Sequence, residues 1–123
     1  MCTPAYGDRD GFYSVVADKP GGGASKASAN LIEELAIANR ILYREGVVDG
    51  FGHISVRSDA DPNRYLLARN MAPALVTPED IVEFDLESNP LNANGRGVYL
   101  ERFIHGEIYR RRPDVIAVVH SHS

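Results

Sequence analysis

The chain has 123 residues, a length that suits one domain with a modest hydrophobic core. Hydrophobic residues make up 44% of it and charged residues 24%, a balance typical of globular proteins. Lys and Arg total 13 against 17 Asp and Glu, and the net charge of −4 argues against nucleic acid or acidic membranes as partners. The lone cysteine, Cys2, excludes an internal disulfide, and no apolar stretch approaches a membrane span. We therefore expect a cytoplasmic protein.

The first part of the chain differs in composition from the rest. Residues 1–27 contain several prolines and the glycine triplet Gly21 to Gly23. We expect a flexible N-terminal tail here, with Gly21 to Ser28 as a linker, and a folded domain over residues 28–123. Phe12 to Val16 has the pattern of a short strand, but the sequence shows no partner for it.

The domain is expected to begin with an amphipathic helix and a hairpin. Asn30 followed by Glu33 resembles a helix cap with its partner, and Gly46 is a plausible end of the helix. From Gly52 to Arg57 polar and apolar residues alternate, as they do in a half-buried strand. A turn over residues 59–63 then predicts that Arg64 to Ala68 returns as the second strand of a hairpin.

A second helix and a final strand follow. After a helical turn at Thr77 to Asp80, a strand over Ile81 to Leu86 and a polar loop, the pattern predicts a helix from about Tyr99 to Arg112. The apolar stripe of that helix is expected to be Leu100, Phe103, Ile104 and Ile108.

The last strand, Val115 to His122, begins apolar on both faces, which predicts a central position in the sheet. The order of elements predicts an α/β fold in which helices pack on a mixed sheet.

Two histidines follow the apolar run at the end of the chain. His120 and His122 are two residues apart, so in a strand both imidazoles point to the same face. Two such nitrogens could hold one divalent metal, and a polar strand end that reaches solvent is the alternative. Catalytic metal sites usually have three protein ligands, so the chain is expected to hold part of such a site.

Glu101 is the carboxylate most suited to join the histidines. The helix that it begins spans about 18 Å. The strand that returns after Pro113 covers about 23 Å. Because these lengths nearly match, Glu101 is expected at the same end of the sheet as His120. A carboxylate there serves as a metal ligand or as a general acid and base, unless it only complements the helix N-terminus.

Two further histidines each have two alternative roles. His105 lies four residues after Glu101 on the same helix face, where we expect a core residue or one that supports the site. His53 follows Gly50 and Gly52 at the start of a strand. Glycines allow the backbone to approach a ligand closely, but a structural turn explains them equally well.

Four segments resemble the class II aldolase/adducin family: Gly52 to Arg57, Thr77 to Ile81, Tyr99 to His105 and Pro113 to His122. The resemblance extends from Leu31 to Ser123 and implies an α/β/α three-layer sandwich, incomplete at its C-terminus. It implies a divalent metal, commonly zinc with manganese or magnesium as alternatives, held by His120, His122 and a third histidine beyond Ser123. It also implies that Glu101 is the acid–base group and that complete members form homotetramers with active sites at subunit contacts.

The resemblance also implies a branch of the family. Members that act on sugar phosphates carry Gly-Asn where this chain has Gly52-His53, and small hydroxyl residues where it has Val98 to Leu100. The stretch from Leu67 to Thr77 instead resembles decarboxylases of carboxylated dihydroxy-aromatics or hydroxy-carboxymuconate semialdehydes. The expected substrate-binding residues are Gly52, His53, Ser55 and Arg69. Arg69 would clamp a substrate carboxylate, with a solvated loop arginine as the alternative.

The expected function is therefore a metal-dependent carbon–carbon lyase, a decarboxylase of a small hydroxy- or oxo-carboxylate. A class II aldolase that acts on a non-phosphorylated hydroxy-aldehyde and a non-catalytic, adducin-like binding module are the alternatives. Because the third histidine would lie beyond Ser123, we expect a fragment, a truncated product or a reduced member. We expect the isolated chain to be inactive rather than active.

Overall fold

The computed structural model describes residues 3–7, 12–16 and 27–121. They form a six-stranded sheet in the order β1-β2-β6-β3-β4-β5. The strands are β1 (Thr3–Gly7), β2 (Phe12–Val16), β3 (His53–Arg57), β4 (Arg64–Ala68), β5 (Ile81–Asp85) and β6 (Val115–His120). Two short 3-10 helices, η1 (Pro73–Leu75) and η2 (Pro78–Asp80), connect β4 to β5.

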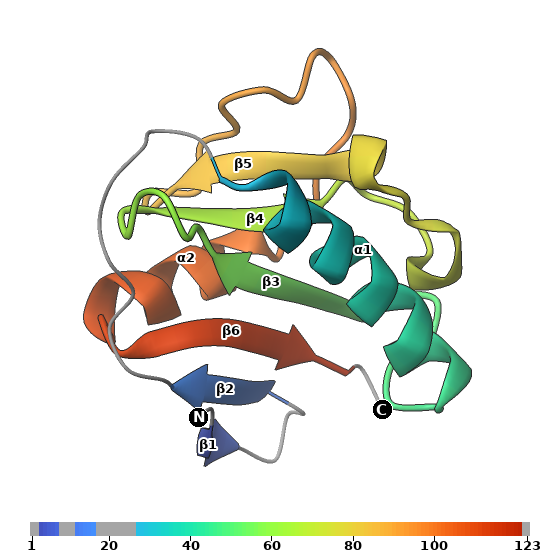
Figure 1. The fold of residues 1–123 in the computed structure, drawn as a ribbon, viewed down its shortest axis with the longest axis horizontal. Coiled ribbons are helices and arrows are strands. Elements are labelled where there is room, and N and C mark those ends of the chain that lie inside the picture. The colour runs from blue at the N-terminus through green and yellow to red at the C-terminus, as the bar shows by residue number, and fades with distance from the viewer. Residues whose placement is uncertain (1–2, 8–11, 17–26, 122–123) are drawn as a thin grey trace.

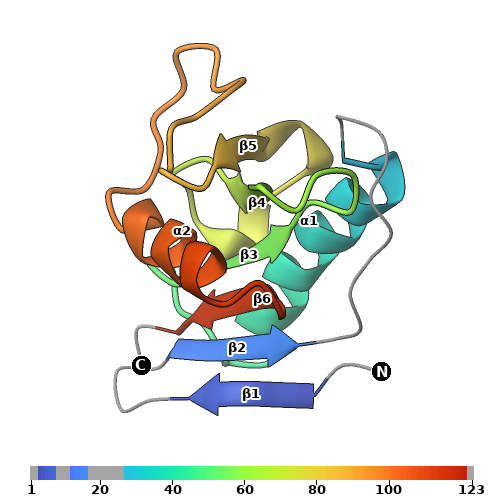
Figure 2. The ribbon, with the colours of Figure 1, turned by 90° about the vertical axis from the view of Figure 1, so that its left-hand side faces the viewer.

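One helix covers each face of the sheet, which gives the expected three-layer α/β/α arrangement. Helix α1 (Ala29–Arg44) lies on one face and α2 (Arg102–Arg111) on the other (Figures 1 and 2). Each interface has its own hydrophobic cluster. Leu35, Leu66 and Val76 belong to the cluster under α1. Tyr65, Phe84 and Val118 belong to the cluster under α2.

The prediction of a mixed sheet is wrong, because every pairing between the described strands is antiparallel. The reason is the connection from β5 to β6. Asp85 pairs with Arg64 at one end of the sheet, whereas Glu101 lies beside His53 at the other. The chain thus runs back along the sheet before α2 begins, and α2 then runs along it again. Because both the loop after β5 and helix α2 cross the length of the sheet, β6 starts at the end where β3 finishes and runs antiparallel to it.

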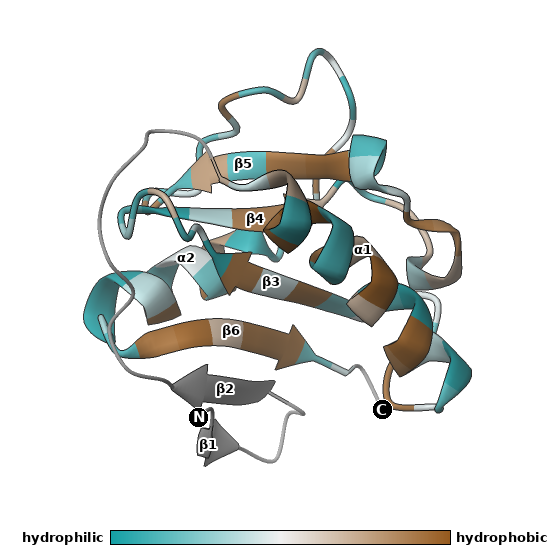
Figure 3. Cartoon of the chain, viewed as in Figure 1, coloured by the Kyte–Doolittle hydropathy of each residue, from teal (hydrophilic) through white to brown (hydrophobic). Residues whose placement is uncertain are grey.

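Strand β6 is central, as its two apolar faces predict, with β2 on one side and β3 on the other. Figure 3 shows that it is hydrophobic over most of its length. The expected strand at Phe12 to Val16 is also confirmed, and its partners are β1 and β6. Two strands therefore lie within the expected tail. The domain boundary at residue 27 stays a prediction, because linker residues 21–26 lie outside the described part of the chain.

Helix α1 begins at a serine instead of the expected asparagine. Ser28 is the N-cap, and its Oγ accepts a hydrogen bond from the backbone N–H of Leu31 at 3.1 Å. Asn30 is already in the first turn. Gly46 follows the helix with a φ of 74°, a left-handed conformation that glycine adopts without strain and that ends the helix as expected. None of the helices in the described ranges is long and apolar enough to cross a bilayer.

The buried face of α2 is not the expected one. Leu100, just before the helix, is 83% exposed, and Phe103 is 53% exposed. Ile104 is also exposed, whereas Ile108 packs against the core as predicted. The buried residues of α2 are His105, Gly106 and Tyr109. Apolar spacing misidentified this face because its inner side carries polar groups that bond to the sheet.

Arg57 fastens the end of α2 to the sheet. Its side chain is buried, and its Nε donates to the carbonyl of Val115 at 2.9 Å. Its Nη2 donates to the carbonyls of Tyr109 and Arg112, each at 2.9 Å. Carbonyls in the last turn of a helix lack hydrogen-bond partners within the helix. A guanidinium at this position donates to them, and its positive charge interacts favourably with the helix dipole.

We predict that Gly106→Ala destabilises the protein. Alanine normally favours a helix over glycine by about 1 kcal/mol. Here, however, an added Cβ would lie 2.2 Å from Ser88 Oγ and 2.9 Å from the Leu86 carbonyl oxygen. We expect the free energy of unfolding in urea to fall by about 1–3 kcal/mol. Gly97→Ala is the control, since nothing lies within 4 Å of a Cβ at Gly97. An unchanged or raised stability in Gly106→Ala would contradict this packing.

Candidate functional site

The pairing of β3 with β6 brings two histidines together. His53 is the first residue of β3, His120 is the last residue of β6, and the two are direct partners across the antiparallel ladder. Directly opposed residues point to the same face of a sheet. His53 Nε2 lies 3.2 Å from His120 Nδ1, and both side chains are buried. Strand register alone thus sets two imidazoles against each other at one end of the sheet.

Gly52 permits this close approach. A Cβ at Gly52 would lie 3.0 Å from the carbonyl oxygen of His120 and 2.6 Å from Val48 Cβ. Any larger residue would push the start of β3 away from the end of β6. The structure therefore gives Gly52 a packing role beside His120, and its expected part in substrate binding remains a prediction.

Glu101 joins the two histidines from the other layer. It directly precedes α2, in the N-cap position, so the helix begins later than the expected Tyr99. Its Oε1 lies 3.4 Å from His53 Nε2, and its Oε2 lies 3.5 Å from His120 Nδ1. The side chain makes no capping hydrogen bond to α2 and is 40% exposed. The helix and strand lengths thus predicted its position correctly, and the carboxylate faces the histidines.

The spacing of these groups fits a divalent ion. His53, Glu101 and His120 each offer a ligand atom, and these atoms lie within 4.8 Å of one another. In a tetrahedral zinc site with bonds of about 2.0–2.1 Å, neighbouring ligand atoms lie about 3.3 Å apart. The two histidine nitrogens, 3.2 Å apart, match that value, whereas the separations of 3.4 and 3.5 Å end on different oxygens of the Glu101 carboxylate. A separation of 3.2 Å is also that of an ordinary hydrogen bond, so distance alone does not decide the role of His53.

The expected ligand His122 lies outside the described residues. The contact of His53 with His120 was not predicted from the sequence, in which His53 was expected only as a substrate-binding residue. The signal was nevertheless present, because a strand that starts at His53 and one that ends at His120 can pair antiparallel with these residues opposed.

Behind the site, a row of buried polar groups continues into the interior. His53 Nδ1 lies 2.7 Å from His105 Nε2, and His105 Nδ1 lies 2.5 Å from Ser55 Oγ. Ser55 Oγ lies 2.8 Å from the Tyr109 hydroxyl. His105 thus supports the site, one of the two roles expected for it. Ser55 is fully buried behind the site, so its expected part in substrate binding would be indirect.

Burial keeps this row uncharged. It lowers the pKa of His105 well below its ordinary value, and the nearby His53 and His120 lower it further. Burial also raises the pKa of the Tyr109 phenol. His105 is therefore a neutral imidazole and Tyr109 a neutral phenol at physiological pH.

Arg69 lies at the same end of the sheet but has another partner. The register that pairs Ser55 with Leu67 would place Arg69 opposite His53. Its Nε donates to Asp80 Oδ1 at 2.8 Å, and the Arg69 side chain is 37% exposed. Burial raises the pKa of Asp80, but hydrogen bonds from Arg69 and Thr77 outweigh it and hold the pKa below its usual value. The guanidinium is thus positioned by a carboxylate of the chain itself.

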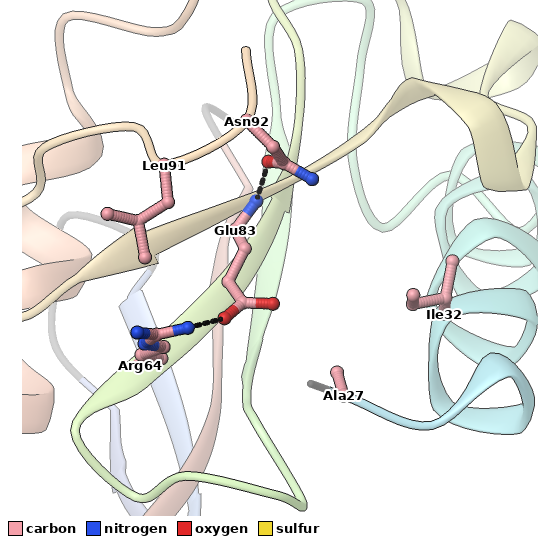
Figure 4. A pocket seen from close by; sticks show the side chains of 6 residues that line it. All are labelled: Ala27, Ile32, Arg64, Glu83, Leu91 and Asn92. Atoms are coloured by element: carbon pink, nitrogen blue, oxygen red, sulfur yellow. Dashed lines mark hydrogen bonds and ion pairs between the residues drawn. The ribbon is translucent and has the colours of Figure 1, made fainter. Parts of the chain in front are cut away.

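A cavity of about 330 Å³ lies elsewhere in the fold, lined by Ala27, Ile32, Arg64, Glu83, Leu91 and Asn92 (Figure 4). Arg64 Nη1 donates to Glu83 Oε2 at 2.8 Å, and Asn92 Oδ1 accepts from the Glu83 N–H. Arg64 begins β4, and the start of β4 lies at the opposite end of the sheet from His53. The polar groups of this cavity satisfy one another, and it is separate from the histidine site.

Comparison with known proteins identifies the family. The profile of the Class II Aldolase and Adducin N-terminal domain matches residues 33–123. The chain is 41% identical over 85 residues to decarboxylase tropJ of Talaromyces stipitatus, and the matched region covers 68% of this chain and 32% of that protein. It is 37% identical over 100 residues to 3,4-dihydroxyphthalate decarboxylase of Arthrobacter keyseri, and that match covers 73% of this chain and 39% of the relative.

The fold agrees with these relatives. The solved structure of L-fuculose 1-phosphate aldolase from Glaciozyma antarctica PI12 superposes with a TM-score of 0.68 at 30% identity. That match covers 77% of this chain and 41% of the aldolase. The chain thus spans less than half the length of these relatives. Since the family profile covers most of the sequence and the layers agree, the chain belongs to the class II aldolase and adducin family.

Proposed function

We propose that the protein is a metal-dependent carbon–carbon lyase, a decarboxylase of a small hydroxy- or oxo-carboxylate from aromatic breakdown. The observation that carries this proposal is the convergence of Glu101 on His53 and His120 at one end of the sheet. Support for decarboxylation comes from the two relatives at 41% and 37% identity, both of which are named decarboxylases. Because the chain spans less than half of either relative, the proposal concerns the activity of the whole protein.

His120 and His122 are the proposed metal ligands, with Glu101 beside them. Imidazole nitrogens favour zinc or another transition metal over magnesium, so zinc is the proposed ion, with manganese or magnesium as alternatives. When bound, the ion supplies Lewis-acid stabilisation of the negative charge that develops on the substrate as the carbon–carbon bond breaks.

Glu101 is the proposed acid–base group. Its carboxyl oxygens lie within 3.5 Å of a nitrogen of His53 and of His120, so two imidazoles orient it. Its partial exposure leaves one side open to a substrate. In this position Glu101 can hold the proton that replaces the departing carboxyl group and deliver it to the carbon.

A carboxylate is a better substrate for this site than a phosphate. At two of the positions where sugar-phosphate enzymes of the family are expected to carry small hydroxyl residues, this chain has Tyr99 and Leu100. The Tyr99 hydroxyl donates to the carbonyl of Met71 at 2.5 Å, and Leu100 has no hydroxyl. Arg69 supplies a guanidinium at the same end of the sheet, suited to bind a carboxylate with two hydrogen bonds.

The proposed enzyme is a cytoplasmic homotetramer. Leu100, Phe103 and Ile104 are exposed next to Glu101, on the outer side of α2. Exposed apolar side chains grouped in this way are typical of a surface that another subunit covers. An assembly that covers them would also close the open side of the proposed site.

We predict that, in the whole protein, Glu101→Gln keeps the metal and loses turnover. A glutamine preserves the shape of the side chain but cannot carry the proton, so the rate should fall by a factor of about 10²–10⁴. Release of carbon dioxide from a panel of hydroxylated aromatic carboxylates measures turnover, and metal content after dialysis measures binding. Glu107→Gln is the control, because Glu107 pairs with Arg110 and Arg111 on the exposed side of α2.

Near-normal turnover in Glu101→Gln would remove Glu101 from the mechanism. A whole wild-type protein that folds but retains no metal after dialysis would contradict the lyase and favour the adducin-like binding module.

We predict that Arg69→Gln weakens substrate binding. Loss of a charged hydrogen bond of about 1.5–3 kcal/mol raises KM by a factor of about 10–100, with a smaller effect on kcat. Arg64→Gln is a matched control, because Arg64 has similar exposure and a similar ion pair, at 2.8 Å to Glu83, at the other end of the sheet. An equal change of KM in both variants would show that Arg69 does not clamp the substrate.

A further inference from the structure

The buried row behind the site determines what His53 can do. We call the chain of hydrogen bonds through Tyr109, Ser55 and His105 to His53 the relay. It connects the interior beneath α2 with the nitrogen of His53 that faces Glu101. Each hydroxyl and each neutral imidazole carries one proton here, so fixing the direction of one bond fixes the direction of the others.

The direction is set at Tyr109. The one hydrogen bond that the Tyr109 hydroxyl makes to a side chain in the described residues is with Ser55 Oγ. The phenol proton needs an acceptor of its own, and in the described part of the chain that acceptor is Ser55 Oγ at 2.8 Å. Arg57 lies over the Tyr109 ring but has only donors. Tyr109 therefore donates to Ser55.

The remaining protons follow in order. Ser55 accepts from Tyr109, so its own proton goes to His105 Nδ1 at 2.5 Å. Neutral His105 then carries its proton on Nε2 and donates it to His53 Nδ1 at 2.7 Å. A neutral imidazole whose Nδ1 accepts carries its proton on Nε2. His53 Nε2 is the atom that lies 3.4 Å from Glu101 Oε1 and 3.2 Å from His120 Nδ1.

We propose that the relay fixes His53 as a hydrogen-bond donor at Nε2, directed at the Glu101 carboxylate and at a carboxylate substrate beside it. His53 is then not a ligand of the ion, because a ligand nitrogen needs its lone pair toward the metal. The reverse direction would leave the Tyr109 proton buried without an acceptor among the described residues, which is unfavourable. His105, Ser55 and Tyr109 are positioning residues that act through His53.

The catalytic consequence rests on the proposed function, whereas the proton positions do not. An N–H directed at Glu101 orients its carboxyl group for proton transfer. The same N–H offers a carboxylate substrate a donor near the ion. The proposal thus assigns different roles to the two histidines, a hydrogen-bond donor for His53 and a metal ligand for His120, although both lie about equally close to Glu101.

Side-chain ¹⁵N NMR of the histidines tests the proposal directly. In metal-free protein we expect His53 to show a protonated Nε2 and an unprotonated Nδ1, and zinc should leave this pattern unchanged. An unprotonated Nε2, or an Nε2 resonance that shifts on zinc addition as a ligand nitrogen does, would overturn the proposal. The metal-free spectrum is informative even if no zinc binds, in which case the lyase fails and the inference about His53 stands.

Tyr109→Phe tests whether the relay sets the direction. Removal of the phenol proton frees Ser55 to point either way, so His53 should show a second tautomer. Tyr65→Phe is the matched control. Tyr65 is buried in the same cluster and stacks on Tyr109 at 5.3 Å, but its hydroxyl lies 2.7 Å from Ser88 Oγ and 3.0 Å from the Arg102 carbonyl oxygen, away from the relay. The proposal is wrong if both variants, or neither, change the tautomer of His53.

His53→Gln provides a readout that does not depend on the fold of the Tyr109 variant. The glutamine side-chain N–H can replace the donor at Nε2, so we expect this variant to retain stoichiometric zinc after dialysis and part of the turnover. His120→Gln is expected to lose zinc. Equal loss of zinc in the two variants would make His53 a ligand and overturn the proposal.

Discussion

The site depends on one backbone constraint, the antiparallel pairing of β3 with β6 that sets His53 opposite His120. A shift of register by one residue would turn one of these imidazoles to the other face of the sheet. Two features hold the register. Gly52 lets the two strands approach at the His53 end. At the opposite end, Arg57 on β3 bonds to Val115, the first residue of β6, and to the last carbonyls of α2. Both strands and the helix that follows Glu101 are thus fixed relative to one another.

The inner face of α2 explains how the fold tolerates polar groups in its interior. His105 and Tyr109 are fully buried, and each is hydrogen-bonded. In the described residues every buried side-chain nitrogen or oxygen has a partner. Such a network is costly to leave half satisfied, so it favours one arrangement of its protons and rotamers over others. The packing of α2 on the sheet therefore also determines the hydrogen-bonding state of the histidine at the site.

The sequence predicted the parts of this arrangement that depend on local pattern and length. The meeting of Glu101 with His120 follows from a helix and a strand of similar length, and the central place of β6 follows from its two apolar faces. Features that depend on long-range pairing were missed. The contact of His53 with His120 requires the strand register, and the antiparallel direction of β6 requires the path of the chain between Asp85 and Glu101.

The buried side of α2 was misjudged for a related reason. Apolar periodicity selects Leu100, Phe103 and Ile104, whereas the helix contacts the sheet through a histidine, a glycine and a tyrosine. Hydropathy scales treat these residues as weak signals. Their partners on the facing strand, Ser55 and His53, make a polar inner face favourable. The cap at Ser28 instead of Asn30 is a smaller error, because both residues can cap a helix.

The central claim is that one divalent ion is held at the end of the sheet where Glu101 and His120 meet. Anomalous diffraction at the zinc absorption edge, on crystals of the zinc-loaded protein, tests it most directly. The account predicts one peak within bonding distance of a His120 nitrogen and beside the Glu101 carboxylate. A protein saturated with zinc that shows no peak there, or shows its peak away from His120, would contradict the account.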